Sequence, residues 1–338
     1  MSQIKNIYVI VLFLVFSLFW GVASAADQKR SYVLATASAG GTYYPVGVAL
    51  ATLTKVKLEP QYGLSVSAIT SAGSGANIKL LRDKEAQFAI LQGLYGAWAA
   101  TGTGEMQGSG KQKYLRSITM LWQNVEHFVI DNKYRKTGTM EDLKELYGQG
   151  FGIGKRNSGT EGSGSHILEK LGIDLSKFTL VHKNYTATSE ALQNGQVAAM
   201  NVPAGPPVSA VTSAYAQLTG KISLLGFTEE QLRKINDGLE LWSAYTIPAS
   251  TYPGQELAVQ TIAQPNFLAV HENVSEEDVY LLTKTIYENL GFLHSIHKAT
   301  KAMSLENSIR GLPVPLHPGA IKFYREKGIS IPKRMIAN

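Results

Sequence analysis

Strand-like and helix-like segments alternate along most of this chain, and this alternation limits the folds that it can adopt. Short apolar runs are each followed by a turn of small residues and then by a helical pattern. The expected strands are 32–37, 64–69, 88–91, 151–153, 179–182 and 197–201, and the expected helices are 43–55, 75–82, 160–171 and 188–194. Repeated strand–turn–helix units build largely parallel sheets covered by helices, so we expect an α/β protein.

Two segments, 116–131 and 257–271, lie outside this alternation and resemble each other in layout. Each has an apolar run, a polar break and a second apolar run, which suits an extended chain that passes from one lobe to another. If both are crossovers, residues 26–125 and 260–338 form lobe 1 and residues 126–259 form lobe 2. Hinged binding proteins, which hold a ligand in the cleft, are built in this way. The alternative is that both segments are ordinary strands of one large sheet.

The first residues have the pattern of a cleavable secretory signal. Lys5 precedes the apolar stretch 7–20, and a run of small residues with an A-x-A pattern ends at Ala25. A membrane anchor is the alternative, but the apolar stretch is shorter than the ~20 residues that a spanning helix needs, and no basic cluster follows it. We therefore expect residues 1–25 to be a signal peptide and the mature protein, starting at Ala26, to be soluble in the periplasm.

Composition and charge exclude several classes of protein. The chain of 338 residues contains no cysteine, which rules out disulfide scaffolds, thiolate metal sites and cysteine nucleophiles. Hydrophobic residues make up 44% of it, so disorder is excluded. The formal net charge of +6 is spread along the chain without a long basic run, so we expect no binding of nucleic acid. Removal of the signal would leave a length that points to two domains.

The common catalytic motifs are absent or incomplete. Gly154 and Lys155 resemble the end of a phosphate-binding loop, but Gln149 and Arg156 break that motif on both sides. The sequence contains no G-x-S-x-G elbow around its candidate serines. His294 and His297 lack the carboxylate spacing of a zinc helix. We therefore expect no enzymatic activity, no metal site and no cofactor.

Three strand-to-helix turns, 38–44, 71–77 and 154–161, are rich in glycine, serine and threonine. Each would expose the free N–H groups of a helix start, and such groups favour carboxylate, phosphate or sulfonate. For any single turn, ordinary helix capping is the alternative. Convergence of at least two turns on one cleft would form an anion site. The polar residues that lie at or just beyond strand ends, where open α/β sheets bind ligands, are Tyr43, Asn77, Gln92 and Thr160.

Several short motifs together resemble the TAXI family of solute-binding proteins. They are GGTYYP at 40–45, Asn77 with the leucines at 80–81, AILQ at 89–92, NSGTE at 157–161, TIPASTYPG at 246–254 and LPVPLHPGA at 312–320. The resemblance implies a two-lobed, type II-like periplasmic binding protein that delivers its solute to a TRAP transporter. It also implies that the ligand is a small organic anion, a dicarboxylate or an acidic amino acid such as 2-oxoglutarate or glutamate.

The resemblance also implies a set of ligand contacts. Carried over to this sequence, they are Gly41, Thr42, Tyr43, Asn77, Gln92, Ser158, Gly159 and Thr160. The chain departs from the family pattern at Lys155 and Arg156 and in the proline-rich loop 201–207. The two basic residues either contact the ligand or are simply solvated.

From these observations we expect a monomeric solute-binding protein whose partners are a small organic anion and the membrane permease subunits of a TRAP carrier. One alternative is the binding subunit of an ABC importer or of a sensor kinase. The other is a periplasmic enzyme that acts on small carboxylates. Gene neighbourhood, ligand binding and turnover separate these alternatives.

Overall fold

The computed structural model describes residues 29–337. The predicted signal peptide, residues 1–25, lies outside this range. Within the described residues, no helix is both long and apolar enough to cross a membrane.

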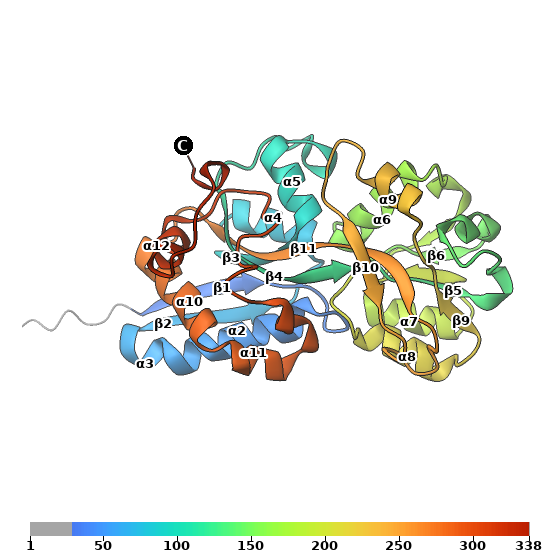
Figure 1. Cartoon of the computed structure of the whole chain (residues 1–338), viewed down its shortest axis with the longest axis horizontal. Helices are drawn as coiled ribbons and strands as arrows, with labels where there is room; N and C mark the ends of the chain where they lie inside the picture. The colour runs from blue at the N-terminus through green and yellow to red at the C-terminus, as the bar shows by residue number, and fades with distance from the viewer. Residues whose placement is uncertain (1–28, 338) are drawn as a thin grey trace, which may run out of the picture.

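The first sheet belongs to the lobe that contains both ends of the described chain (Figure 1). Its strand order is β10-β11-β3-β1-β2, and β4 also pairs with β11. The bounds are β1 Arg30–Ala35, β2 Leu64–Ile69, β3 Phe88–Gln92, β4 Leu115–Val125, β10 Ser243–Ile247 and β11 Val259–His271. Strand β1 is parallel to β2 and β3, whereas β11 is antiparallel to β3, β4 and β10.

The second sheet forms the other lobe and has the order β7-β6-β8-β5-β9. Its bounds are β5 Phe128–Asp131, β6 Gly150–Gly152, β7 Thr179–Val181, β8 Ala199–Asn201 and β9 Ile222–Leu224. Strand β6 is parallel to β7 and β8, and β5 is antiparallel to β8 and β9. The predicted α/β fold with two lobes is therefore confirmed, and the alternative of one large sheet is excluded.

Two crossings join the lobes. The chain leaves β4 and enters β5 through Glu126 and His127, and it returns along the long strand β11, beside which β10 runs in the opposite direction. Strand β10 falls within the range 126–259 predicted for lobe 2, yet it pairs with the first residues of β11 and so extends the first sheet. The domain boundaries themselves remain a prediction.

Helices cover both sheets. Those of the first lobe are α2 Tyr43–Lys57, α3 Glu59–Tyr62, α4 Ser74–Arg82, α5 Gly93–Thr101, α10 Glu276–Glu288, α11 Leu290–Ile296 and α12 Pro318–Glu326. Those of the second lobe are α6 Gly159–Lys170, α7 Tyr185–Gln193, α8 Ser209–Gln217 and α9 Glu229–Ile235. Short 3₁₀ helices are Gly104–Met106, Asn132–Tyr134, Met140–Leu146, Leu175–Lys177, Lys298–Ala302 and Lys333–Met335.

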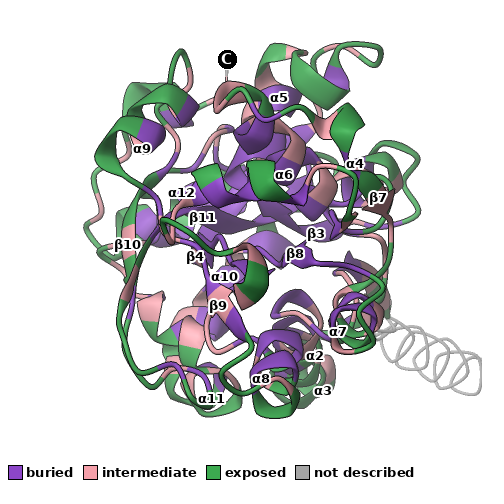
Figure 2. Cartoon of the chain, turned by 90° about the vertical axis from the view of Figure 1, so that its right-hand side faces the viewer, coloured by how far each residue is buried: buried purple, intermediate pink, exposed green. Residues whose placement is uncertain are grey.

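The buried residues lie mainly on the strands, and the outer faces of the helices are exposed (Figure 2). All five residues of β3 are buried, as expected for a strand covered on both faces. Local capping explains where the helices begin. Ser275 caps α10 by accepting a hydrogen bond from the Asp278 N–H at 3.1 Å.

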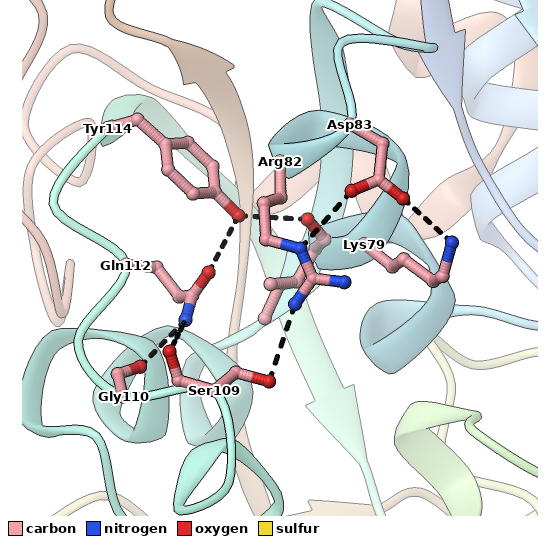
Figure 3. Close-up of polar contacts among 8 residues, drawn as sticks. Lys79, Arg82, Asp83, Ser109, Gly110, Gln112 and Tyr114 are labelled. Carbon is pink, nitrogen blue, oxygen red and sulfur yellow. Dashed lines mark hydrogen bonds and ion pairs between the residues drawn. The ribbon is translucent and has the colours of Figure 1, made fainter.

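The outer end of α4 is held in place by polar contacts with the 109–114 loop (Figure 3). The Tyr114 hydroxyl lies 2.9 Å from the Ile78 carbonyl, and the Arg82 guanidinium lies 3.3 Å from the Ser109 hydroxyl. Gln112 closes the loop on itself by donating to the Gly110 carbonyl at 2.7 Å. These contacts hold the helix in a fixed orientation, with its N-terminal end facing the second lobe.

Candidate functional site

A small cavity lies between the two lobes. Its lining from the first lobe is Ala37, Ser38, Gly41, Thr42, Tyr43, Ala72, Gly73, Ser74 and Gln92. Its lining from the second lobe is Lys155, Ser158, Gly159, Thr160, Lys183, Asn184, Tyr185, Pro203 and Ala204. The volume of about 30 Å³ holds only a few water molecules, so the structure represents lobes that are closed.

The N-terminal ends of four helices lie at the cavity. Helices α2 and α4 start at its first-lobe side, and α6 and α7 start at its second-lobe side. The first N–H groups of a helix have no partner within the helix, and the helix dipole places partial positive charge there. The predicted convergence of glycine-rich turns on one cleft is therefore confirmed for all three of them.

The first-lobe wall offers neutral hydrogen-bonding groups. The Tyr43 hydroxyl donates to the Asn266 side-chain oxygen at 2.6 Å, and burial raises the phenol's pKa, so it stays protonated. Ser74 Oγ accepts a hydrogen bond from the Gln92 backbone N–H at 3.1 Å. Gln92 is 3% exposed, and its side-chain oxygen has no partner among the described residues. This wall can therefore bind a ligand by hydrogen bonding without any proton transfer.

The second-lobe wall contains a cap and a chain of hydroxyl groups. Ser158 Oγ accepts from the Glu161 N–H at 3.0 Å, so Ser158 is the cap of α6. The Tyr185 hydroxyl donates to the Pro203 carbonyl at 2.8 Å and lies 2.6 Å from Thr160 Oγ1. Because a phenol has one proton, Thr160 must donate to Tyr185 in this arrangement. Thr160 therefore presents its lone pairs to the cavity until this chain of hydroxyl groups reorients.

Hydrogen bonds between the lobes hold the cavity closed. They join Thr42 Oγ1 to the Gly205 carbonyl, Ser209 Oγ to the Gly40 carbonyl, the Tyr95 hydroxyl to the Ser158 carbonyl and the Ala76 N–H to the Asn157 carbonyl, at 2.9–3.0 Å. Glycines permit this approach, because a Cβ atom on Gly75 would lie 2.7 Å from the Asn157 carbonyl oxygen. A ligand can therefore enter only after these bonds open.

The structure brings the predicted site residues to the cavity with one exception. Gly41, Thr42, Tyr43, Gln92, Ser158, Gly159 and Thr160 all line it. Asn77 does not, because its amide nitrogen donates to the Thr36 and Ile90 carbonyls at 2.8 and 2.9 Å. It ties together the ends of β1 and β3 and so supports the site from behind. That the lining residues bind a ligand remains a prediction.

The two basic residues at the start of α6 have different surroundings. Lys155 lines the cavity, whereas Arg156 points to solvent and lies 3.4 Å from the Glu161 carboxylate. Lys155 can therefore attract an anionic ligand, whereas the charge of Arg156 is already balanced by the Glu161 carboxylate.

Sequence reasoning missed the lining at 183–185. The helix predicted from 188 in fact begins at Tyr185, because Asn184 caps it by accepting from the Ala187 N–H at 2.9 Å. An asparagine just before a helical pattern is a capping signal, and it could have identified this turn. The lining at 203–204 lies in the proline-rich loop that stood out in the sequence.

Among the described residues, no group of three or more histidine or acidic side chains is placed to hold a metal ion. The polar groups that line the cavity are hydroxyls, side-chain amides and the ammonium groups of Lys155 and Lys183, and these groups can bind a ligand by hydrogen bonding and charge attraction.

Comparisons with known proteins agree with this architecture. A model of the NMT1-like family matches residues 34–328. A protein of Bordetella bronchiseptica RB50 is similar in structure, with a TM-score of 0.51, 16% identity and coverage of 91% of this chain and 86% of that chain.

Two further similar structures have descriptions that name a ligand class. The periplasmic aliphatic sulphonate binding protein of Escherichia coli has a TM-score of 0.45 and 13% identity, over 88% of this chain and 83% of that chain. The binding protein component of an ABC phosphonate transporter from Pseudomonas aeruginosa has a TM-score of 0.47 and 14% identity, over 80% and 78%. At these identities a likeness concerns the fold alone.

Proposed function

The chain belongs to the NMT1-like family, and from that premise we propose that it is an extracytoplasmic solute-binding protein that closes its lobes on a small organic anion. The observation that carries this proposal is the convergence of four helix N-termini, two from each lobe, on one interlobe cavity. An acidic group placed there would accept hydrogen bonds from both lobes at once. Binding would then favour the closed state, which is the state that a partner can recognise.

Two lysines support an anionic ligand. Lys155 and Lys183 both line the cavity and come from different turns of the second lobe. Their charges add to the partial positive charge of the helix ends. The small volume of the closed cavity favours a compact solute such as a dicarboxylate, an amino acid, a sulfonate or a phosphonate.

The proposed partner is a membrane transporter. The sequence motifs resemble those of TAXI proteins, but the family that the comparison identifies is the NMT1-like family, so a TRAP carrier rests on the motif resemblance alone. The phosphonate-binding structure is described as part of an ABC transporter, and this description agrees better with the alternative of an ATP-driven importer. At this sequence identity, similarity of fold does not distinguish a TRAP carrier from an ATP-driven importer. The proposal therefore includes both as partners, with a sensor kinase as the third.

Transport assays separate these partners. Vesicles that contain the permease encoded beside this gene would be supplied with the purified protein and labelled solute. Uptake that requires ATP supports an importer, whereas uptake that stops when the ion gradient is dissipated supports a TRAP carrier. A solute-dependent change in the phosphorylation of a neighbouring kinase supports the sensor.

Location is tested separately. We propose that the protein is periplasmic and that its mature chain begins at Ala26. Mass analysis of the protein from a periplasmic extract should return this N-terminus, and a product that retains the apolar stretch 7–20 would contradict it.

Ligand binding is tested by thermal stability. A ligand present at about 100 times its Kd adds about 2.7 kcal/mol to the free energy of unfolding, which raises Tm by several degrees in a chain of this size. A screen of small carboxylates, amino acids, sulfonates and phosphonates should find such a compound. NMR should recover it unchanged after incubation, whereas product formation would favour the enzyme alternative. If no compound in the screen changes Tm, the proposed function is wrong.

A further inference from the structure

A carboxyl group lies in the first turn of α6, where its charge opposes the binding of an anion. Glu161 is the third residue of this helix, and its side chain is 22% exposed. Gly159 and Thr160, which precede it, line the cavity. The negative charge of Glu161 cancels part of the partial positive charge at this helix end, so it reduces the attraction for an acidic solute. Its position is therefore explained by a second role, which its contacts define.

Glu161 holds the turn that precedes α6. Its Oε2 atom accepts a hydrogen bond from the Asn157 backbone N–H at 2.7 Å. Asn157 has a φ of 60°, in the left-handed region that residues other than glycine adopt only rarely. A hydrogen bond to an ionised acceptor is stronger than one between neutral groups. The bond to Glu161 therefore stabilises a backbone conformation that is otherwise unfavourable.

The Asn157 carbonyl contacts the other lobe. It accepts a hydrogen bond from the Ala76 N–H at 3.0 Å. Ala76 lies in the first turn of α4, so its N–H has no acceptor within that helix. The two backbones approach so closely that a Cβ atom on Gly75 would lie 2.7 Å from the Asn157 carbonyl oxygen. The N–H of Asn157 is therefore held by Glu161 in its own lobe, while its carbonyl receives the start of α4 from the other lobe.

Glu161 also contacts the second turn of its lobe that lines the cavity. Its Oε1 atom lies 3.3 Å from His182 Nδ1, at the distance of an ion pair but without the geometry of a hydrogen bond. His182 directly precedes the lining residues 183–185. One carboxylate therefore contacts both turns that bring Lys155 and Lys183 to the cavity. Of these two contacts, only the one to the turn that contains Lys155 is a hydrogen bond.

We propose that Glu161 is a positioning residue for lobe closure, because it orients the Asn157 carbonyl that the Ala76 N–H contacts. This inference rests on the proposed function, in which closure binds the solute. The sign of one effect separates this role from a merely electrostatic one. Removal of a negative charge beside an anion site strengthens binding, whereas loss of the positioned carbonyl weakens it.

Hydrogen exchange at the Ala76 N–H tests the inference on the whole protein without any solute. NMR measures the exchange rate in the unaltered protein and in Glu161→Ala. Because one interlobe hydrogen bond becomes weaker, exchange of the Ala76 N–H should accelerate by about two- to tenfold in the variant. The Asn77 N–H, which donates to the Gly73 carbonyl within α4 at 2.8 Å, is the internal control and should exchange as before.

The conservative variant should restore the contact. Glu161→Gln removes the charge but keeps a side-chain oxygen that can accept from the Asn157 N–H. Its Ala76 N–H should exchange within about twofold of the rate in the unaltered protein. Glu161→Asp keeps the charge but withdraws the carboxylate by one methylene, so it should accelerate exchange as alanine does. Glu169→Ala is the matched control, because Glu169 is exposed on the same helix, and it should change neither amide.

Binding is measured with succinate, L-glutamate, taurine and 2-aminoethylphosphonate by calorimetric titration. For each of these compounds that binds, affinity should fall by about two- to tenfold in Glu161→Ala and stay level or rise in Glu161→Gln. In a Gly75→Ala background the added Cβ atom already displaces the Asn157 carbonyl, so Glu161→Ala should cost less than about a further twofold. This non-additivity distinguishes positioning from a general loss of stability.

The outcomes are distinct. Unchanged exchange of the Ala76 N–H in Glu161→Ala, tighter binding by that variant, or equal losses in both backgrounds would overturn the positioning role and leave the proposed function in place. Free exchange of this N–H in the unaltered protein under every condition tested would also overturn it, because the contact is then not formed. If Glu161→Ala does not fold, Glu161→Asp and Glu161→Gln decide. If no compound binds here or in the wider screen, the proposed function fails, while the exchange rates still decide whether Glu161 holds the interlobe contact.

Discussion

Replacing Gly75 with alanine should weaken ligand binding without weakening the fold. Gly75 lies in the first turn of α4, and a Cβ atom there would lie 2.7 Å from the Asn157 carbonyl oxygen of the other lobe. Because this neighbour is a backbone atom, the lobes must separate by about 0.7 Å to restore an ordinary contact of 3.4 Å. The conformation of Gly75 itself is compatible with alanine, since its φ is not positive.

The separation breaks hydrogen bonds that close the cavity. The Ala76 N–H to Asn157 carbonyl bond, 3.0 Å long, would exceed bonding distance, and the nearby Tyr95 hydroxyl to Ser158 carbonyl bond, also 3.0 Å, would weaken. Each bond contributes about 0.5–1.5 kcal/mol, so closure loses about 1–3 kcal/mol. Affinity for a ligand that binds the closed state should fall by about 5- to 150-fold.

The assay combines calorimetric titration with the melting curve of the unliganded protein. Alanine is preferred to glycine in a helix by about 0.5–1 kcal/mol, so the unliganded Tm should stay level or rise. Gly291→Ala on α11 is the matched control, because a Cβ atom there meets nothing within 4 Å. Unchanged affinity in Gly75→Ala would refute the argument that closure at this contact is part of binding.

Three further predictions concern charged and capping groups of the protein. Ser158→Ala removes the cap of α6 and should lower the free energy of unfolding by about 1 kcal/mol in a urea titration; an unchanged midpoint would contradict that role. Burial raises the pKa of Glu126 to about 8 in the folded protein, whereas its pKa in the unfolded chain is near 4.5. The folded protein therefore loses stability as pH rises from 4.5 through 8, and Glu126→Gln should show a smaller fall of Tm between pH 5 and 9. Equal slopes of Tm against pH in the unaltered protein and in the variant would show that the pKa of Glu126 is not raised. Lys155→Glu should reduce affinity at low and high salt, whereas Arg156→Glu should have an effect that high salt abolishes, because Lys155 lines the cavity and Arg156 does not. The opposite pattern would contradict the placement of these residues.

Local signals predicted the elements that form the site. The turns before α2, α4 and α6 are recognisable because glycine, serine and threonine accumulate where a strand ends and a helix starts. The strand predicted at 64–69 coincides with β2. These features depend on neighbours in the sequence, so a pattern of residues is enough to find them.

Other parts of the site could not be predicted in this way. Asn77 lies in one of the turns predicted to bind the ligand, yet its amide nitrogen donates to backbone carbonyls at the ends of β1 and β3. Only the assembled sheet shows this arrangement. The turn at 183–185 carries a capping signal in Asn184, but only the packing of α7 in the second lobe brings that turn to the cavity. Glu126, which lies outside the cavity, gave no signal of its burial, since the residues that bury it are far away in the chain.

The sequence by itself determined the α/β alternation, the two crossings and the glycine-rich helix starts, because hydrophobic period, capping and turn chemistry act over a few residues. The tertiary structure decided which of these starts meet and how close the lobes come, as the Ala76 to Asn157 bond shows. It also decided that a carboxyl group would be buried at the hinge. These properties arise from contacts between distant segments, whose free energies depend on burial and mutual geometry that exist only once both lobes have folded and closed.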